Sequence, residues 1–280
     1  MRFTTVQSFL DFVQEELEAN RLVLPTLPDI ALKVRGAVDK GDASAVELAQ
    51  MIATDASVSA RLIQVANSPL YRGGVEIKNI QMAVTRLGMK TTRSLVTSIV
   101  MQQLFKPSSK VMEQNFRKIW EQSTNVASIS RALSGFVPNL NADEAMLAGL
   151  IHAIGKLPIL TLVEKIPEFR DSPSRLEKLL DKTHTAVGKL IMDTWTFPDE
   201  LRRVPSEYLN FSYQAEGAAD YVELVQVAFL QSIAGTDHPA TRVEWSSVPA
   251  FAKLGLAPDV EIMEIEGVPE EIELTNSMLH

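Results

Sequence analysis

The sequence predicts an all-α fold, and three observations support this prediction. Apolar residues recur at every third or fourth position in many stretches of the 280-residue chain, as they do on the buried face of a helix. Residues that favour helix ends, chiefly Ser, Asp, Pro and Gly, separate these stretches. We find no convincing run in which apolar and polar residues alternate, which is the pattern of a half-buried strand. With 46% hydrophobic residues, the chain can bury a substantial core, in one large domain or two smaller ones.

The composition excludes several classes of function. A net charge of −8 argues against nucleic-acid binding, because phosphate contacts need clustered Lys and Arg. No apolar run approaches the length of a membrane span, and the N-terminus lacks a signal pattern, so we expect no membrane association. The absence of cysteine removes disulfides, thiolate metal sites and cysteine nucleophiles. These features are compatible with a bacterial cytoplasmic protein, which is our expectation.

The first part of the chain divides into short helices whose ends have local signals. Ser44 and Glu47 form a capping-box pattern, and Asp55 can cap the helix that follows. Glycine ends two of the predicted helices, at Gly41 and Gly88. The predicted ranges are 5–19, 29–40, 44–53, 56–66, 80–87 and 92–104.

A loop with candidate recognition residues is predicted at positions 67–74. Its Asn, Pro and paired Gly residues all favour a turn. Asn67, Tyr71 and Arg72 could form a surface for a ligand or partner. A turn that ends the preceding helix explains the same residues equally well, so both interpretations stay open.

Longer helices are expected after a junction at residues 107–109, which reads Pro-Ser-Ser. Asp143 and Glu144 begin a central apolar helix, because acidic side chains favour a helix N-terminus. This helix kinks at Gly155 and Pro158 and then continues over 157–163. The other predicted ranges are 111–133, 174–182, 185–195, a short helix from 198, and 217–233.

The last part of the chain, from residue 236, is acidic. Nine Asp and Glu residues there face only Arg242 and Lys253. Short helices are expected around 249–254 and 257–265. We expect the final dozen residues to be loose, as chain ends often are.

The central apolar helix carries one ionisable group in its middle, His152. A lone histidine in such a helix is usually a neutral, hydrogen-bonded core residue. Lys156, one turn later, is most simply a cation that interacts with the carbonyl groups at a helix end.

The same segment, Gly-Leu-Ile-His-Ala-Ile-Gly-Lys-Leu, resembles the signature of the HD superfamily of metal-dependent phosphohydrolases. In that signature a His-Asp doublet ligates a divalent metal, whereas the doublet here reads His152-Ala153. At other positions where the resemblance implies ligands, the chain has Gln122, His184 and Phe229, and it has Tyr208-Leu209 where related proteins often carry a His-His pair. Two histidines and no carboxylate do not make a stable metal site. A buried Phe229 ring would gain about 1.5–3 kcal/mol and fill the metal cavity.

The resemblance extends over residues 20–235. A Leu-Pro-x-Leu-Pro segment, the Asn-Ser-Pro-Leu-Tyr loop and an Ala-Val-Thr-Arg-Leu-Gly segment occur together in the HDOD family of HD-related output domains. This family implies a two-lobed helical fold and a role in bacterial signalling. We expect an N-terminal lobe at 1–108, an HD-like lobe at 109–235 and a partly helical acidic tail at 236–280.

The resemblance and the lost ligands together indicate a non-catalytic module that binds a signalling protein or a small-molecule signal. We expect no metal and no cofactor, and we expect the partner or ligand in the groove between the lobes. In this interpretation the pocket around His152 is a vestige, and Lys156, which could contact a phosphate in an active relative, has no substrate. The alternative is a divergent metal-dependent phosphohydrolase. Its candidate ligands, whose ordinary roles are helix capping or surface solvation, are Asp143, Glu144, Asp181 and Asp193.

Overall fold

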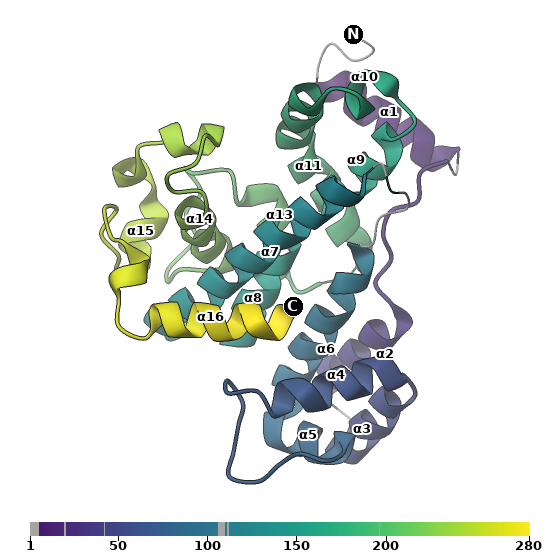
Figure 1. The fold of residues 1–280 in the computed structure, drawn as a ribbon, viewed down its shortest axis with the longest axis vertical. Helices are drawn as coiled ribbons and strands as arrows, with labels where there is room; N and C mark the ends of the chain where they lie inside the picture. Colours follow the sequence, from purple (N-terminus) through teal and green to yellow (C-terminus); the bar gives the residue numbers. More distant parts are fainter. Residues whose placement is uncertain (1–5, 20, 42, 106–109, 111, 196) are drawn as a thin grey trace.

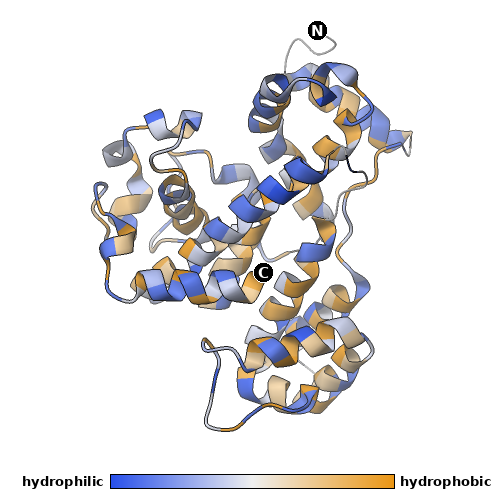
Figure 2. Cartoon of the chain, viewed as in Figure 1, coloured by the Kyte–Doolittle hydropathy of each residue, from blue (hydrophilic) through white to orange (hydrophobic). Residues whose placement is uncertain are grey.

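The computed structural model describes residues 6–19, 21–41, 43–105, 110, 112–195 and 197–280. Every regular element in these residues is a helix, so the all-α prediction is confirmed (Figure 1). Figure 2 shows hydrophobic residues concentrated on the helix faces that turn towards other helices. The junction predicted at 107–109, and with it the expected lobe boundary after residue 108, lies outside the described residues.

Five helices form the lower end of the molecule in Figure 1. They are α2 (Asp29–Lys40), α3 (Ala45–Ala53), α4 (Ala56–Ala66), α5 (Ile80–Leu87) and α6 (Met89–Leu104). Ser44 and Glu47 form both bonds of a capping box, and Asp55 accepts hydrogen bonds from two backbone amides of α4, as predicted. Helix α6 begins three residues earlier than expected, because Gly88 at φ 77° turns the chain directly from α5 into α6.

Helix α1 (Val6–Glu18) lies at the opposite end of the molecule, against α11 (Pro173–Trp195) (Figure 1). Its Phe9 and Val13 side chains are buried. The connector to α2 is held at Pro25, whose carbonyl accepts a hydrogen bond from Trp195 Nε1 at 2.9 Å. Helix α1, which we expected in the N-terminal lobe, therefore packs on the second lobe. Apolar periodicity identifies the buried face of a helix but not the neighbour that buries it.

The second lobe is built around α7 and α8, which pack along their lengths. A Cβ atom on Gly149 of α8 would lie 2.4 Å from the Cα of Ala127 in α7, so this close approach requires glycine. The helices are α7 (Glu113–Leu133), α8 (Ala142–Ile151), α9 (Lys156–Val163), α10 (Pro167–Arg170), α11, α12 (Asp199–Arg202), α13 (Val204–Glu207) and α14 (Tyr221–Ser232).

Two expectations about these helices were wrong. Helix α11 is continuous, although the sequence suggested separate helices over 174–182 and 185–195. No Pro or Gly interrupts it there, and Thr183 Oγ1 donates to the Leu179 carbonyl inside the helix. The helical segment Ala142–Val163 is long and apolar enough to cross a membrane, contrary to expectation, yet 94% of its apolar window is buried inside the protein. It is the core of the second lobe.

The tail covers the second lobe and ends in a helix, coloured yellow in Figure 1. Helix α15 (Pro249–Lys253) packs on α14, and of the helix expected at 257–265 only a 3₁₀ turn at Ile262–Glu264 is present. The other 3₁₀ turns are Ser134–Phe136, Pro239–Arg242 and Trp245–Ser247.

The final dozen residues are not loose. They form α16 (Val268–Leu279), which packs against α7. Val268, Ile272, Met278 and Leu279 are buried there. A twelve-residue helix is marginal by itself in water, so tertiary burial, which the local sequence does not reveal, stabilises it.

Candidate functional site

The structure brings His152, His184 and Phe229 together in the core of the second lobe. His152 follows α8, His184 lies in the middle of α11 and Phe229 lies on α14. All three are buried. Tyr208, which directly follows α13, lies between them: its ring centroid is 4.9 Å from that of His152 and 5.1 Å from that of Phe229. The sequence offered no signal for Tyr208 beyond its place where related proteins often carry histidines.

Both ring nitrogens of His184 are engaged. Nδ1 lies 2.6 Å from the Leu180 carbonyl, and Nε2 lies 2.6 Å from the Tyr208 hydroxyl. A carbonyl oxygen can only accept, so Nδ1 carries the proton and Nε2 accepts from the Tyr208 hydroxyl. No lone pair on this ring is left for a metal ion.

His152 is held differently. Its Nδ1 donates to the Gly149 carbonyl at 2.6 Å, and its Nε2 is buried without a hydrogen-bond partner among the described residues. The Phe229 ring centroid lies 6.0 Å away. Ala153, the next residue, is fully buried and presents a methyl group. The hydrogen-bond acceptors of the two histidine Nδ1 groups are therefore the backbone carbonyls of Gly149 and Leu180. Gln122 lies half-buried on α7.

Burial dominates the protonation of this cluster. It lowers the pKa of His152 and of His184 from 6.5 to about 3, so both rings are neutral at pH 7. Burial also lowers the pKa of Lys156, against the opposing effect of Asp181 and Glu177 on α11.

The sequence also failed to indicate that His238 belongs to this cluster. Its ring centroid lies 5.3 Å from that of Phe229, although it comes after α14 and carries no motif. Burial lowers its pKa as well.

The buried rings of His152 and His184 should make the protein less stable in acid. Between pH 6.5 and about pH 3 the unfolded chain binds a proton on each histidine and the folded chain does not. The free energy of unfolding therefore falls as the pH falls, by about 1.4 kcal/mol per pH unit for each ring. His152→Leu should remove one such contribution, which urea unfolding at several pH values between about 4 and 6 would measure. Equal slopes in variant and wild type would contradict the neutral, buried state of His152.

The residues around this cluster do not fit a metal centre. Among the described residues, no group of three or more His, Cys, Asp and Glu side chains could hold a metal ion. Imidazole and carboxylate ligands are what a hydrolytic metal would need here. In their place the cluster presents a methyl group at Ala153, an aromatic ring at Phe229 and a hydroxyl at Tyr208 that is bound to His184.

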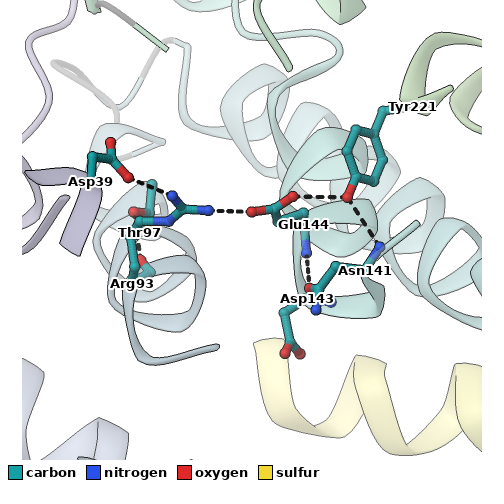
Figure 3. Close-up of polar contacts among 7 residues, drawn as sticks. All are labelled: Asp39, Arg93, Thr97, Asn141, Asp143, Glu144 and Tyr221. Carbon is teal, nitrogen blue, oxygen red and sulfur yellow. Dashed lines mark hydrogen bonds and ion pairs between the residues drawn. The ribbon is translucent and has the colours of Figure 1, made fainter. Parts of the chain in front are cut away.

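A second group of polar residues joins the two lobes at the N-terminus of α8 (Figure 3). Glu144 accepts hydrogen bonds from Arg93 of α6 and from the Tyr221 hydroxyl, the latter at 2.8 Å. Arg93 also pairs with Asp39 of α2 at 2.5 Å. Asn141 caps α8 and accepts from the amides of Asp143 and Glu144. Glu144 is therefore a structural link between α6, α8 and α14.

Asp143, the neighbour of Glu144, links α8 to α7 and to the loop that contains Tyr71. It accepts hydrogen bonds from the Tyr71 hydroxyl and from Arg131 of α7, and both Asp143 and Arg131 are about 8% exposed. Tyr71, a candidate for a recognition surface, is thus bound inside the molecule. Asn67 exchanges two hydrogen bonds with the backbone of Ile77, at 2.8 and 2.9 Å, while Arg72 is exposed.

A cleft with a volume of about 850 Å³ lies beside the Glu144 link. Its lining comes from α6, from the start of α8 and from residues 200–221 of the second lobe. The side chains with charge or aromatic character there include Lys90, Glu144, Glu200, Arg203, Tyr213 and Tyr221. It is a polar groove of the second lobe that Lys90 of α6 borders, and the sequence led us to expect a ligand or partner between the lobes.

Comparison with known proteins identifies the family. The HDOD domain matches residues 24–208, so the chain belongs to the HDOD domain family, as its motifs predicted. An uncharacterized protein of Treponema pallidum (strain Nichols) is 21% identical over 221 residues, which cover 74% of this chain. The chain spans only 41% of the length of that relative.

Solved structures share the fold over nearly the whole chain. A protein of Shewanella amazonensis SB2B named "putative metal-dependent phosphohydrolase" has a TM-score of 0.83 and 28% identity, covering 99% of this chain and 100% of its own. An HDOD domain protein with unknown function from Geobacter sulfurreducens has a TM-score of 0.70 and 22% identity, covering 99% of each chain. A "putative signal transduction protein" of Marinobacter aquaeolei VT8 has a TM-score of 0.62 and 21% identity, covering 91% of this chain and 60% of its own.

Proposed function

We propose that this chain is a non-catalytic signalling module of the HDOD family, which binds a protein partner or a small signal in the bacterial cytoplasm. The observation that carries the proposal is the bonding of His184, whose two ring nitrogens lie at hydrogen-bond distance from the Leu180 carbonyl and the Tyr208 hydroxyl. A metal ligand needs a free nitrogen lone pair. The doublet that supplies a carboxylate in HD hydrolases ends here in Ala153.

A hydrolytic centre also needs an open position for water beside its metal. The aromatic rings of Tyr208 and Phe229 pack against the His152 ring, which would have to be a ligand of that metal. Exposing the Phe229 ring to open such a position would cost roughly 1.5–3 kcal/mol of lost burial. The packing of these three residues therefore supports a filled, inert core.

We place the binding surface in the cleft of about 850 Å³ that the second lobe forms beside Lys90 of α6. A cleft buries more of a ligand than a flat surface does, and polar groups fix its orientation. Lys90 and Arg203 are exposed cations in its lining, and the half-buried Tyr213 offers an aromatic ring whose hydroxyl donates to Asp220. No nucleic acid and no membrane belong to this proposal.

One observation favours the alternative, a divergent metal-dependent phosphohydrolase. The Shewanella amazonensis protein that bears such a name is 28% identical over nearly the whole chain. A shared fold does not establish an activity, however. Of the four candidate carboxylates, Asp143 and Glu144 pair with arginines and Asp193 pairs with Lys189 at 2.6 Å, while Asp181 faces Lys156.

Elemental analysis of protein purified without chelator or affinity-tag metal separates the two functions. We expect far less than stoichiometric iron, manganese and zinc in both the wild type and His152→Ala, and no turnover of phosphomonoesters or phosphodiesters. Near-stoichiometric metal that disappears in His152→Ala would favour the phosphohydrolase and refute our proposal.

A further inference from the structure

Helix α16 bridges the two lobes. Along α7 it runs antiparallel: Arg131 Nε lies 3.4 Å from Glu271 near the start of α16, and Ser128 Oγ donates to Asn276 at 2.7 Å near its end. These polar contacts flank the buried apolar residues of α16, which are Val268, Ile272, Met278 and Leu279.

The end of α16 reaches the N-terminal lobe. Arg61 of α4 donates from Nη2 to the Met278 carbonyl at 2.6 Å. Carbonyls in the last turn of a helix lack partners inside the helix, so this arginine caps α16. Met278 and Leu279 also line a small cleft together with Leu95 of α6 and Trp120 of α7. We call the surface of α4, α6 and α7 that α16 covers the α16 groove.

The fit of α16 in this groove is incomplete. A cleft of about 640 Å³ remains between α16 and the loop after α4, and Ser68 lines it. The Ser68 hydroxyl is buried without a hydrogen-bond partner, as is that of Ser98 in the smaller cleft beneath Met278. Thr275, fully buried on α16, has an unpaired hydroxyl as well. An unpaired buried hydroxyl costs free energy, so these three groups weaken the contact of α16 with the groove.

We propose that the α16 groove binds an acidic amphipathic helix of a partner protein, and that α16 occupies the groove as an intramolecular competitor. The chemistry of the occupant follows from the groove: Arg131 takes a carboxylate near the start of the helix, Arg61 takes a carbonyl at its end, and apolar residues lie between. A partner helix with polar side chains opposite Ser68 and Ser98 satisfies groups that α16 leaves unpaired. This inference rests on the proposed function, that the module acts by binding.

Release of α16 has a clear physical route. Twelve residues form a marginal helix in water, so α16 unfolds when it leaves the groove. The groove is then open in only a small fraction of molecules, and the apparent affinity for a partner is reduced by that fraction. A change that weakens α16 alone should therefore strengthen partner binding.

A labelled synthetic peptide of residues 266–280, titrated into the full chain, tests this competition. Ile272→Asp removes a buried side chain of α16, and we expect this variant to bind the peptide at least about tenfold more tightly than the wild type does. Glu273→Gln, on the exposed face of α16, is the matched control and should bind as the wild type does. Adding Arg61→Glu to Ile272→Asp should abolish the gain, because the groove then repels the peptide.

Native-state hydrogen exchange of the wild type tests the same inference without a substitution. We expect amides of α16 to exchange at least about a hundredfold faster than those of α8, because α16 opens locally. Exchange of both helices at one common rate would overturn the proposal, as would a folded Ile272→Asp variant that does not bind the peptide. Wild-type dimers formed through exchange of α16 would also overturn it, in favour of a second copy as occupant. None of these outcomes bears on metal content or turnover, which test the proposed function separately.

Discussion

Gly155→Ala should destabilise the folded chain by more than about 3 kcal/mol, or prevent folding altogether. A Cβ atom at position 155 would lie 2.0 Å from the carbonyl oxygen of His184 and 2.5 Å from the backbone nitrogen of Gly188. Both are backbone atoms of α11, so no side-chain rotation can relieve the clash. Urea unfolding followed by circular dichroism measures the loss.

The matched control is Gly36→Ala, within α2, where an added Cβ would meet nothing within 4 Å. Alanine is the better helix former, so this variant should be more stable than the wild type by about 0.5–1 kcal/mol. If Gly155→Ala and Gly36→Ala had similar stabilities, the close approach of the α9 start to α11 would be wrong. The glycine of the Ile-Gly-Lys motif is thus required by helix packing, whether or not a metal is bound nearby.

Asp143→Asn should cost about 3–5 kcal/mol of unfolding free energy, because it leaves the buried guanidinium of Arg131 without its main anion. Glu271 lies 3.4 Å from Arg131 Nε and can compensate only in part, since Glu271 is more exposed. The Tyr71 hydroxyl would lose its charged acceptor at the same time. Thermal or urea unfolding of the purified variant measures the effect.

Asp193→Asn makes the same chemical change in an exposed pair. Lys189 and Asp193 are 61% and 42% exposed, so their pair is screened by water, and its loss should change stability by less than about 1 kcal/mol. A loss for Asp143→Asn no larger than that for Asp193→Asn would show that the Asp143–Arg131 pair does not hold α7, α8 and the 67–77 loop together.

Some helix caps and the family of this protein could be predicted from its sequence, because each depends on residues that lie close together in the chain. The capping box of Ser44 and Glu47 and the cap at Asp55 depend on residues within one turn of each other, and the structure has them. The family could be recognised because its motifs are short continuous segments. The departures from the HD pattern at Ala153 and Phe229 were visible for the same reason.

Other features depend on contacts between residues far apart in the chain, and only the tertiary structure decided them. It placed Tyr208 against His184, 24 residues earlier, and so determined how that ring is bonded. It turned Asp143, which by itself predicts only a helix N-terminus, into the partner of Tyr71 across 72 residues. It also docked the final dozen residues as α16, which we expected to be loose because they are a chain end. Helix caps and periodicity act within a few residues, whereas burial depends on which distant surfaces meet, and that is decided by the packing of the whole chain.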